Sequence, residues 1–253
     1  MLIVTHRHRE ADLALWRDLE EGDRVRNIEK LVARSLDAIS EFLKQGPCYC
    51  SVSWGKDSVT MADLVGRVDP SIPLVHLRPT NHNPDCDLVR DAYFATHPHQ
   101  LQCYREYPID YTKVEWLVLS EPERDKATDK EWFGTIRRIE KEFGCRRILG
   151  IRAEESRGRL IRCFRWGELS KNACAPLAFW KAADVFAYLA QRDLPVHPAY
   201  GYLGGGRWLR ERIRVAEIGD THGRGSGRGE WEQEYYGDWL HKIEHEAYRR
   251  RIG

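Results

Sequence analysis

Apolar residues return along this chain at the spacing of amphipathic helices. Between residues 23 and 45 they recur every three or four positions and stop at Gly46-Pro47, which predicts one strong helix. A weaker pattern of the same kind predicts a helix at about 9–20. Another helix is predicted at 129–143, where Gly144 ends it. Each of these helices should bury one face and expose the other.

Short apolar runs lie between the helical segments and predict buried strands. The expected strands are at about 48–53, 73–77, 100–104 and 147–151, with helices at about 59–65 and 85–96. Strands that alternate with helices indicate an α/β fold with a doubly wound, mostly parallel sheet. Ligands of such sheets bind beyond the carboxyl ends of the strands, so the loops that follow these strands are the candidates for chemistry.

The second half of the chain is less regular. A helix is predicted at about 181–191, and an aromatic, amphipathic one at about 230–250. Between them, residues 201–229 are rich in glycine and arginine and have too little apolar content to fold tightly by themselves. We therefore expect three parts. They are an N-terminal helical segment (1–46) that packs against the core or a second subunit of a homo-oligomer, an α/β domain (47–200), and a C-terminal Gly/Arg-rich loop with a helix (201–253).

Composition narrows the class of protein without identifying a partner. With 42% hydrophobic and 31% charged residues, the 253-residue chain is expected to be a soluble globular protein. Its 40 basic and 39 acidic side chains balance, so net charge argues neither for nor against nucleic acid. We expect no signal peptide and no membrane span, since a span needs an apolar run of about 20 residues.

Seven cysteines are scattered along the chain, an odd number that argues against a disulfide framework and favours a reducing cytoplasm. Cys145, Cys163 and Cys174 could converge on a metal or iron–sulfur cluster, but their spacings match no common site. Burial of these cysteines as small apolar residues is the favoured interpretation.

The segment Ser53-Trp54-Gly55-Lys56-Asp57-Ser58 lies between a predicted strand and a predicted helix. A helix N-terminus presents free N–H groups and a partial positive charge, to which Lys56 adds a full one. Gly55 would let the backbone approach a ligand closely, and the Ser53 and Ser58 hydroxyls could donate to phosphate oxygens. The order strand, polar turn, helix therefore predicts a phosphate site, with an ordinary solvated turn as the alternative.

This segment is not a Walker loop, because Lys56 is followed by Asp57 and no glycine lies five positions before Gly55. It resembles the Ser-Gly-Gly-x-Asp-Ser PP-loop of the adenine-nucleotide α-hydrolase-like superfamily. That superfamily includes ATP pyrophosphatases and phosphoadenosine-phosphosulfate (PAPS) reductases. Trp54 stands where the first glycine of that loop usually is.

A second motif, Gly150 to Arg159, follows the predicted strand at 147–151 and should open on the same edge of the sheet. Its arginines suit phosphate or sulfate, because the planar guanidinium binds two oxygens together. The alternative is a solvated, charged helix start. The motif resembles the Gly-x-Arg-x-x-Glu-Ser-x-x-Arg element of PAPS reductase-like proteins, and residues 176–200 resemble that family's next block.

The resemblance covers about residues 48–200 and leaves the reaction open. PAPS reductases attack the sulfonate sulfur with a cysteine in a C-terminal tail, whereas this chain has no cysteine after Cys174. The resemblance then implies ATP cleavage between the α and β phosphates, in which a substrate oxygen attacks the α-phosphorus and becomes adenylated. The alternatives are a PAPS reductase with an unusual thiol and a nucleotide-binding adaptor without catalysis, which Trp54 would support.

The resemblance implies ATP and Mg²⁺ as cofactors and assigns roles residue by residue. The implied catalytic residues are Lys56, Asp57, Arg152 and Glu155, with Asp57 also as the metal ligand. The implied nucleotide-binding residues are Ser53, Trp54, Gly55, Lys56, Asp57, Ser58, His76, Gly150, Arg157 and Arg159.

Partners are implied in the same way. Relatives of similar shape include the ATP pyrophosphatases of DNA phosphorothioation, which work beside a cysteine desulfurase. A sulfur transfer to DNA or to another acceptor is therefore implied, with a cysteine desulfurase as partner. The basic stretch at 201–229 would suit contact with a polyanion, and the alternative is a mobile surface loop.

Overall fold

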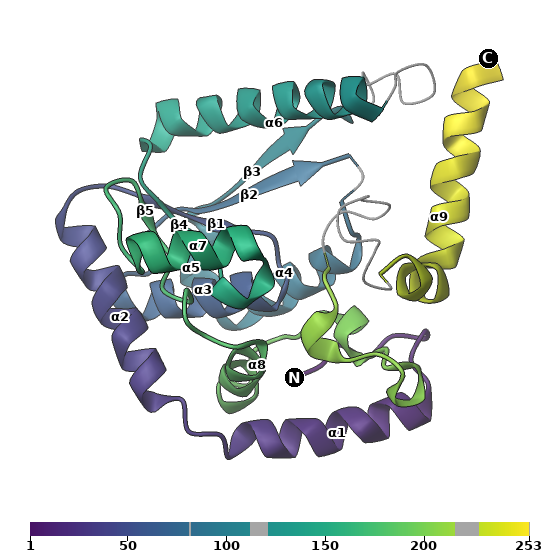
Figure 1. Cartoon of the computed structure of the whole chain (residues 1–253), viewed down its shortest axis with the longest axis horizontal. Coiled ribbons are helices and arrows are strands. Elements are labelled where there is room, and N and C mark those ends of the chain that lie inside the picture. The colour runs from purple at the N-terminus through teal and green to yellow at the C-terminus, as the bar shows by residue number, and fades with distance from the viewer. Residues whose placement is uncertain (81, 112–120, 216–227, 253) are drawn as a thin grey trace.

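The computed structural model describes residues 1–80, 82–111, 121–215 and 228–252. A single five-stranded sheet lies at its centre, in the order β3-β2-β1-β4-β5 (Figure 1). The strands are β1 (Tyr49–Val52), β2 (Leu74–Pro79), β3 (Tyr104–Ile109), β4 (Arg147–Ile148) and β5 (Ala173–Cys174). All four neighbouring pairs are parallel. The predicted α/β fold with a doubly wound, parallel sheet is confirmed.

Helices and short turns connect the strands. The helices are α1 (Glu10–Arg24), α2 (Glu29–Lys44), α3 (Lys56–Val68), α4 (Asp85–Thr96), α5 (Pro98–Leu101), α6 (Glu121–Phe143), α7 (Arg157–Trp166), α8 (Ala182–Gln191) and α9 (Arg228–Ile252). The 3₁₀ turns are η2 (Ala153–Glu155), η3 (Pro198–Gly201), η4 (Gly204–Gly206) and η5 (Arg210–Arg212). None of the helices in the described ranges is both long and apolar enough to cross a membrane.

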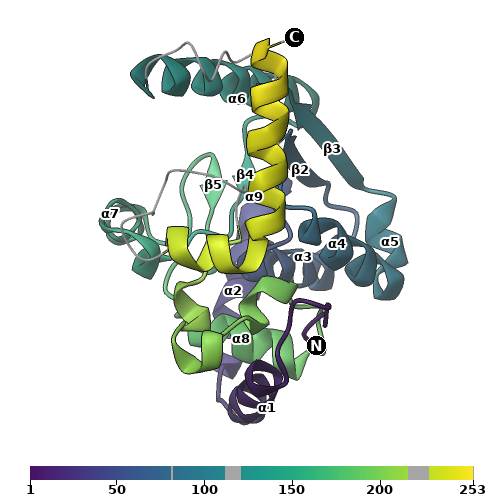
Figure 2. The ribbon, with the colours of Figure 1, turned by 90° about the vertical axis from the view of Figure 1, so that its right-hand side faces the viewer.

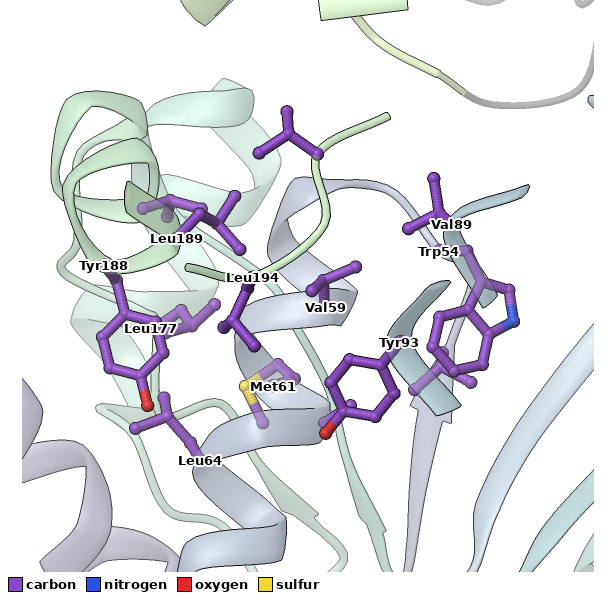
Figure 3. Packing of buried hydrophobic residues seen from close by; sticks show 14 of the residues in the cluster. Trp54, Val59, Met61, Leu64, Val89, Tyr93, Leu177, Tyr188, Leu189 and Leu194 are labelled. Atoms are coloured by element: carbon purple, nitrogen blue, oxygen red, sulfur yellow. The ribbon is translucent and has the colours of Figure 1, made fainter. Parts of the chain in front are cut away.

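The two faces of the sheet bury different sets of side chains, as strand alternation requires. On one face, Tyr49 and Val75 pack against Ile139 of α6. On the other face lies the main core, whose centre is α3 between α4 and α8 (Figure 3). Met61 and Leu64 of α3 are completely buried there. This packing holds α3, and with it the loop at its N-terminus, against the middle of the sheet.

The single helix predicted at 23–45 is wrong. Helix α1 runs on to Arg24, and α2 begins only at Glu29. The Gln191 side chain donates hydrogen bonds to the carbonyl oxygens of Asp23 (3.1 Å) and Arg26 (2.7 Å), which a continuous helix would have used internally. This contact with α8, which is distant in sequence, interrupts the helix that the apolar spacing predicts and leaves two separate helices.

The strand predicted at 100–104 is displaced, and three elements were missed or misjudged in length. Residues 98–101 form a helical turn that begins with proline, and β3 starts at Tyr104. Strand β3 is an edge strand with polar, partly exposed side chains, so it gives no apolar signal. Helix α7 and the two-residue β5 were not predicted, and β4 covers only Arg147–Ile148 of the expected 147–151.

The N-terminal and C-terminal segments both pack on the core. Trp16 of α1 meets Phe186 of α8 edge to face, with ring centroids 5.8 Å apart. Residues 201–215 pack against the main core, with Tyr202 and Val215 buried, and the prediction that this stretch cannot fold tightly by itself stays a prediction. Residues 216–227 of that prediction lie outside the described residues. The final helix is confirmed as α9, and the part boundaries at 46 and 200 stay predictions.

Candidate functional site

The two motifs singled out in the sequence meet between β1 and β4, where the order of the strands along the chain reverses. From β1 the chain proceeds to β2 and β3 on one side, whereas β4 and β5 lie on the other side. The segment 53–58 follows β1, and the segment 150–159 follows β4, its immediate parallel neighbour. In doubly wound sheets the crevice outside the carboxyl ends of two such strands is the usual place for a ligand.

The loop after β1 delivers the N-terminus of α3 to this crevice. Gly55 occupies the N-cap position and α3 begins at Lys56. The Ser58 hydroxyl donates to the Gly55 carbonyl oxygen (3.1 Å), so it stabilises the first turn of α3 from within. Ser53 is exposed at the end of β1. The N-terminal amides of α3, rather than the Ser58 hydroxyl, are therefore the natural anion donors of this loop.

Three charged side chains join the two motifs, and two of them, Lys56 and Arg152, are buried. The Lys56 Nζ lies 2.8 Å from one carboxylate oxygen of Asp57, and the Arg152 Nε lies 2.6 Å from the other. Lys56 and Arg152 are 4% and 2% exposed, so both cations are almost fully shielded from water. Burial by itself would raise the pKa of Asp57, but Lys56 and Arg152 outweigh it and hold that pKa below its ordinary value. Asp57 is thus ionised and neutralises one of the two cations.

The turn η2 orients Arg152 from its other side. The Arg152 guanidinium also pairs with Glu154, and the Arg152 backbone N–H donates to the Glu155 carboxylate (2.8 Å). Glu155 pairs in turn with Arg159 of α7. Gly150 permits the approach of this segment to α3, because a Cβ there would lie 3.3 Å from Met61 Cγ. The structure therefore brings Arg152, Glu155, Arg159 and Gly150 together with the PP-loop candidate.

The backbone conformation and the packing of Trp54 explain why a tryptophan can stand in this loop. Its φ of +61° is left-handed, a conformation that favours glycine and strains any other residue. The Trp54 ring is fully buried among Tyr93, Phe94 and Tyr104, with centroid distances of 5.2–5.7 Å, and its Nε1 donates to the Tyr104 hydroxyl (3.3 Å). In Figure 3 the ring lies beside Tyr93, within the core. Aromatic packing therefore holds a backbone conformation that the family loop leaves to glycine.

Two residues assigned to nucleotide binding, His76 and Arg157, form no hydrogen bond or ion pair with Lys56, Asp57 or Arg152 in the described structure. His76 of β2 is buried and shares a hydrogen bond with the Tyr104 hydroxyl (3.0 Å), which places it behind Trp54. Arg157 is exposed at the start of α7, and it forms no ion pair with any residue in the described ranges. Their roles in binding stay predictions, as do those of the residues that the structure does bring together.

Sequence reasoning missed the groups that cover the loop. The Lys56 Nζ lies 5.4 Å from the centre of the Tyr200 ring, and the Tyr200 hydroxyl would lie 3.5 Å from a Cβ on Gly55. Val215 Cγ2 would lie 3.1 Å from a Cβ on Gly55, and Arg214 donates to the Glu155 carbonyl oxygen (2.6 Å). Tyr200 falls in a matched motif block, but no local pattern points to residues 214 and 215, since only the fold brings them here.

The cysteines do not form a thiol centre at this site. The exposed Cys145 precedes β4, so it lies at the amino end of the strands, opposite the PP-loop. Cys86 of α4 lies on the carboxyl side, but it is 4% exposed and burial raises the pKa of its thiol well above the ordinary value. Cys163 and Cys174 are buried as small apolar residues, as expected, whereas the expected burial of Cys145 is wrong, because Cys145 is exposed just before β4.

Mg²⁺ would find few protein ligands here. In the described ranges, no three His, Cys, Asp or Glu side chains form a group that could hold a metal ion. Both oxygens of Asp57 are already used by Lys56 and Arg152. A Mg²⁺ ion would therefore have to be held chiefly by the phosphates of a bound nucleotide, and its assignment to Asp57 stays a prediction.

The fold is that of the adenine-nucleotide α-hydrolases. The NMN synthetase of Francisella tularensis superposes with a TM-score of 0.51 at 12% identity, over 84% of this chain and 87% of that protein. This likeness shows the fold alone. A Mg²⁺ or ATP requirement does not follow from it.

The family follows from sequence comparison. A PAPS reductase of Synechococcus sp. is 28% identical over 180 residues, which is 67% of this chain and 77% of that protein. A PAPS reductase of Gloeobacter violaceus is 28% identical over 163 residues, which is 58% of this chain and 63% of that protein. These names support the reductase alternative of the sequence analysis better than ATP cleavage. The family model for the phosphoadenosine phosphosulfate reductase domain matches residues 47–222, and the chain belongs to this family.

Proposed function

We propose that the chain is a nucleotide-dependent enzyme that binds the phosphates of an adenine nucleotide between the N-terminus of α3 and Arg152. The observation that carries this proposal is the pair of buried cations, Lys56 and Arg152, which share a single carboxylate, Asp57. Glu154 also pairs with Arg152, but it is exposed to solvent, so positive charge dominates among the buried groups beside this helix N-terminus, where an anion is favoured. A bound phosphate chain would complete this balance.

The residues divide the binding between them. The α3 amides would donate to phosphate oxygens, and Lys56 would add a point charge. Arg152 would offer the remaining N–H groups of its planar fork, held in orientation by Asp57 and Glu154. Tyr200 and Val215 would limit the access of water to the bound phosphates, since both are buried over the loop.

For the reaction, we propose cleavage of ATP between the α and β phosphates. An oxygen of the acceptor forms a bond to the α-phosphorus, the bond from that phosphorus to the bridging oxygen breaks, and the electron pair leaves with pyrophosphate. The protein contributes positioning and charge neutralisation, and Mg²⁺ bound to the phosphates would supply further neutralisation. The position of the cysteines supports this choice, because none of them is both accessible and at the carboxyl edge of the sheet.

PAPS reduction is the second candidate, and the names of the two relatives favour it. It requires a thiolate that attacks the sulfonate sulfur and releases the nucleotide. In this chain such a thiol would have to come from Cys86 after a rearrangement or from a partner. The names of the relatives do not mention DNA or a cysteine desulfurase, and both partners remain predictions from the resemblance.

The first experiment measures binding and products separately. Calorimetric titration with ATP and with PAPS gives the Kd for each nucleotide. Lys56→Ala should weaken the preferred nucleotide by about tenfold or more, because a charge-assisted hydrogen bond is lost. Lys44→Ala is the matched control, since Lys44 is an exposed lysine of α2 that pairs with Glu41.

Incubation with α-labelled ATP and Mg²⁺ then tests the reaction. AMP or an adenylated acceptor, formed together with pyrophosphate, supports the first candidate, provided that Lys56→Ala removes both products. Sulfite released from PAPS in the presence of a thiol reductant would replace the first candidate by the second. If neither nucleotide binds, or if Lys56→Ala binds both as tightly as the unmodified chain does, the proposed site is wrong.

A further inference from the structure

Helix α7 exposes the residues that a helix of this composition normally buries. Among its ten residues only Cys163 is buried. Four of its large apolar side chains face solvent, and Phe164 and Ile161 are 75% and 58% exposed. The described residues include thirteen large hydrophobic side chains that are exposed, and four of them lie on this one short helix. Such a concentration is unusual for scattered surface residues and marks an interaction site.

The exposed residues form a continuous stripe along α7. Residues 157, 160, 161, 164 and 165 recur at steps of three and four, so their side chains share one face of the helix. We define the α7 stripe as Arg157, Leu160, Ile161, Phe164 and Arg165. Its centre is apolar and both of its ends are arginines. Figures 1 and 2 show α7 in the outer layer of the molecule, on its near face in the first view and at its edge in the second.

All the charged side chains of α7 are positive. The helix carries four arginines and no acidic residue: Arg157, Arg159, Arg162 and Arg165. The acids just before the helix are already engaged, since Glu154 pairs with Arg152 and Glu155 with Arg159. Arg157 and Arg165 form no ion pair within the described part of the chain, and the Arg165 guanidinium stacks over the Trp166 ring at 5.1 Å. The stripe is thus electropositive at both ends.

We propose that the α7 stripe is the docking surface for a partner protein whose own apolar face is bordered by aspartate or glutamate. Exposed aromatic rings and arginines around an aliphatic centre have the composition of a protein interface core. A second copy of this chain fits poorly, because antiparallel pairing of two α7 helices would bring arginine ends together. A nucleic acid would use the arginines but would leave Leu160 and Ile161 without apolar contacts.

A partner on this stripe would lie next to the nucleotide site. The Ser156 hydroxyl accepts from the Arg159 backbone N–H (3.2 Å) and caps α7 at its start. Glu155 pairs with Arg159 and also accepts from the Arg152 backbone N–H. One carboxylate therefore ties the first turn of α7 to the arginine that holds Asp57. The docking surface stands on the exposure and charge of α7 and does not depend on which reaction the site performs.

The test uses a defined probe with the full chain. The probe is a fluorescein-labelled amphipathic helical peptide of about 20 residues, with leucines on one face and glutamates beside them. Its control has lysine in place of every glutamate. Fluorescence anisotropy should give a Kd for the acidic peptide that is about tenfold or more below that of the lysine peptide. Hydrogen exchange at residues 157–166 should slow only with the acidic peptide.

Two variants place the binding on α7. Phe164→Glu and Arg165→Glu should each weaken the acidic peptide by about tenfold or more, because one removes the apolar anchor and the other reverses a flanking charge. Phe133→Glu is the matched control, since Phe133 is a half-exposed phenylalanine of α6 (51%), and its Kd should not change. Both α7 positions face solvent, so circular dichroism should show the variants folded.

Four results would overturn the proposal. The first is failure of the acidic peptide to bind, and the second is binding that Phe164→Glu and Arg165→Glu leave unchanged. The third is protection of residues 157–166 by oligothymidylate instead, which would make α7 a nucleic-acid surface. The fourth is a dimer in sedimentation analysis that Phe164→Glu dissociates, which would make the occupant a second copy of the chain.

Discussion

Replacing Trp54 by glycine, the residue that the family loop usually has there, tests how this chain holds its loop. The Trp54 side chain is fully buried among three aromatic rings, and truncation of a buried tryptophan to alanine costs about 3–5 kcal/mol of unfolding free energy. Alanine would keep the left-handed backbone and its strain. Glycine would relieve about 1–2 kcal/mol of that strain and lose about 0.5–1 kcal/mol through the greater entropy of the unfolded chain.

Glycine is usually more destabilising than alanine, but here the glycine variant should be the more stable of the two. Trp54→Ala should lose about 4 kcal/mol and Trp54→Gly about 3 kcal/mol. Urea unfolding followed by far-ultraviolet circular dichroism measures the difference. With a slope of about 3 kcal/mol per molar urea, Trp54→Gly should lower the midpoint by about 1 M. An alanine variant as stable as the glycine variant would refute the assigned strain, and a glycine variant as stable as the parent would refute the assigned packing.

The same variant has a consequence for the loop as a binding element. The Trp54 ring points into the aromatic cluster, so its removal should leave the nucleotide Kd within about threefold where the variant is folded. Trp54 was the main sequence feature in favour of an adaptor that has lost catalysis. Its burial behind the loop removes that support, because the ring does not occupy the space beside the buried cations.

Three further changes have expected outcomes. Arg152→Lys should weaken nucleotide binding by about tenfold in calorimetry, because lysine lacks the fork that reaches two carboxylates at once. Burial lowers the pKa of His197 to about 3, so on acidification the unfolded chain takes up a proton at this residue before the folded chain does. Lowering the pH from 7 to 5 should therefore cost about 2 kcal/mol of unfolding free energy, and His197→Asn should abolish this loss. Burial would raise the pKa of Asp63, but hydrogen bonds from His97 and Arg192 outweigh it and lower the pKa to about 2. In urea unfolding, Asp63→Asn should therefore lose about 2 kcal/mol of unfolding free energy at pH 7, and this loss should vanish as the pH falls towards 2.

The sheet and most helices could be predicted because their signals are local. The apolar runs that became β1 and β2, and the spacing within α6, α8 and α9, follow from residues close together in sequence. The failure at the first helix has a different cause, a contact between distant segments. The Gln191 side chain ends the first helix by donating hydrogen bonds to the carbonyl oxygens of Asp23 and Arg26. Gln191 lies far from these residues in sequence, so no local window could reveal the contact.

The candidate site divides in the same way. A phosphate loop after β1 and an arginine turn after β4 were predictable because each has a local motif and parallel strands open on one edge. Their direct ion pair through Asp57, and the cover provided by Tyr200 and Val215, depend on the packing of segments that lie far apart in the chain. Helix α7 was missed although Leu160, Ile161 and Phe164 have helical spacing, because four arginines interrupt the apolar pattern.

The charge arrangement at α3 gives a reason to regard this as a site rather than a structural ion network. A structural network of buried charges gains most when each cation is balanced by its own anion, because an unbalanced buried charge loses its hydration without compensation. Here Lys56 and Arg152 share Asp57, and Glu154, which also contacts Arg152, is an exposed residue that accepts from the Ala182 backbone as well. The excess positive charge lies beside free helix amides, which adds to the imbalance. An anion with several oxygens is what this arrangement lacks, and a nucleotide phosphate chain supplies one.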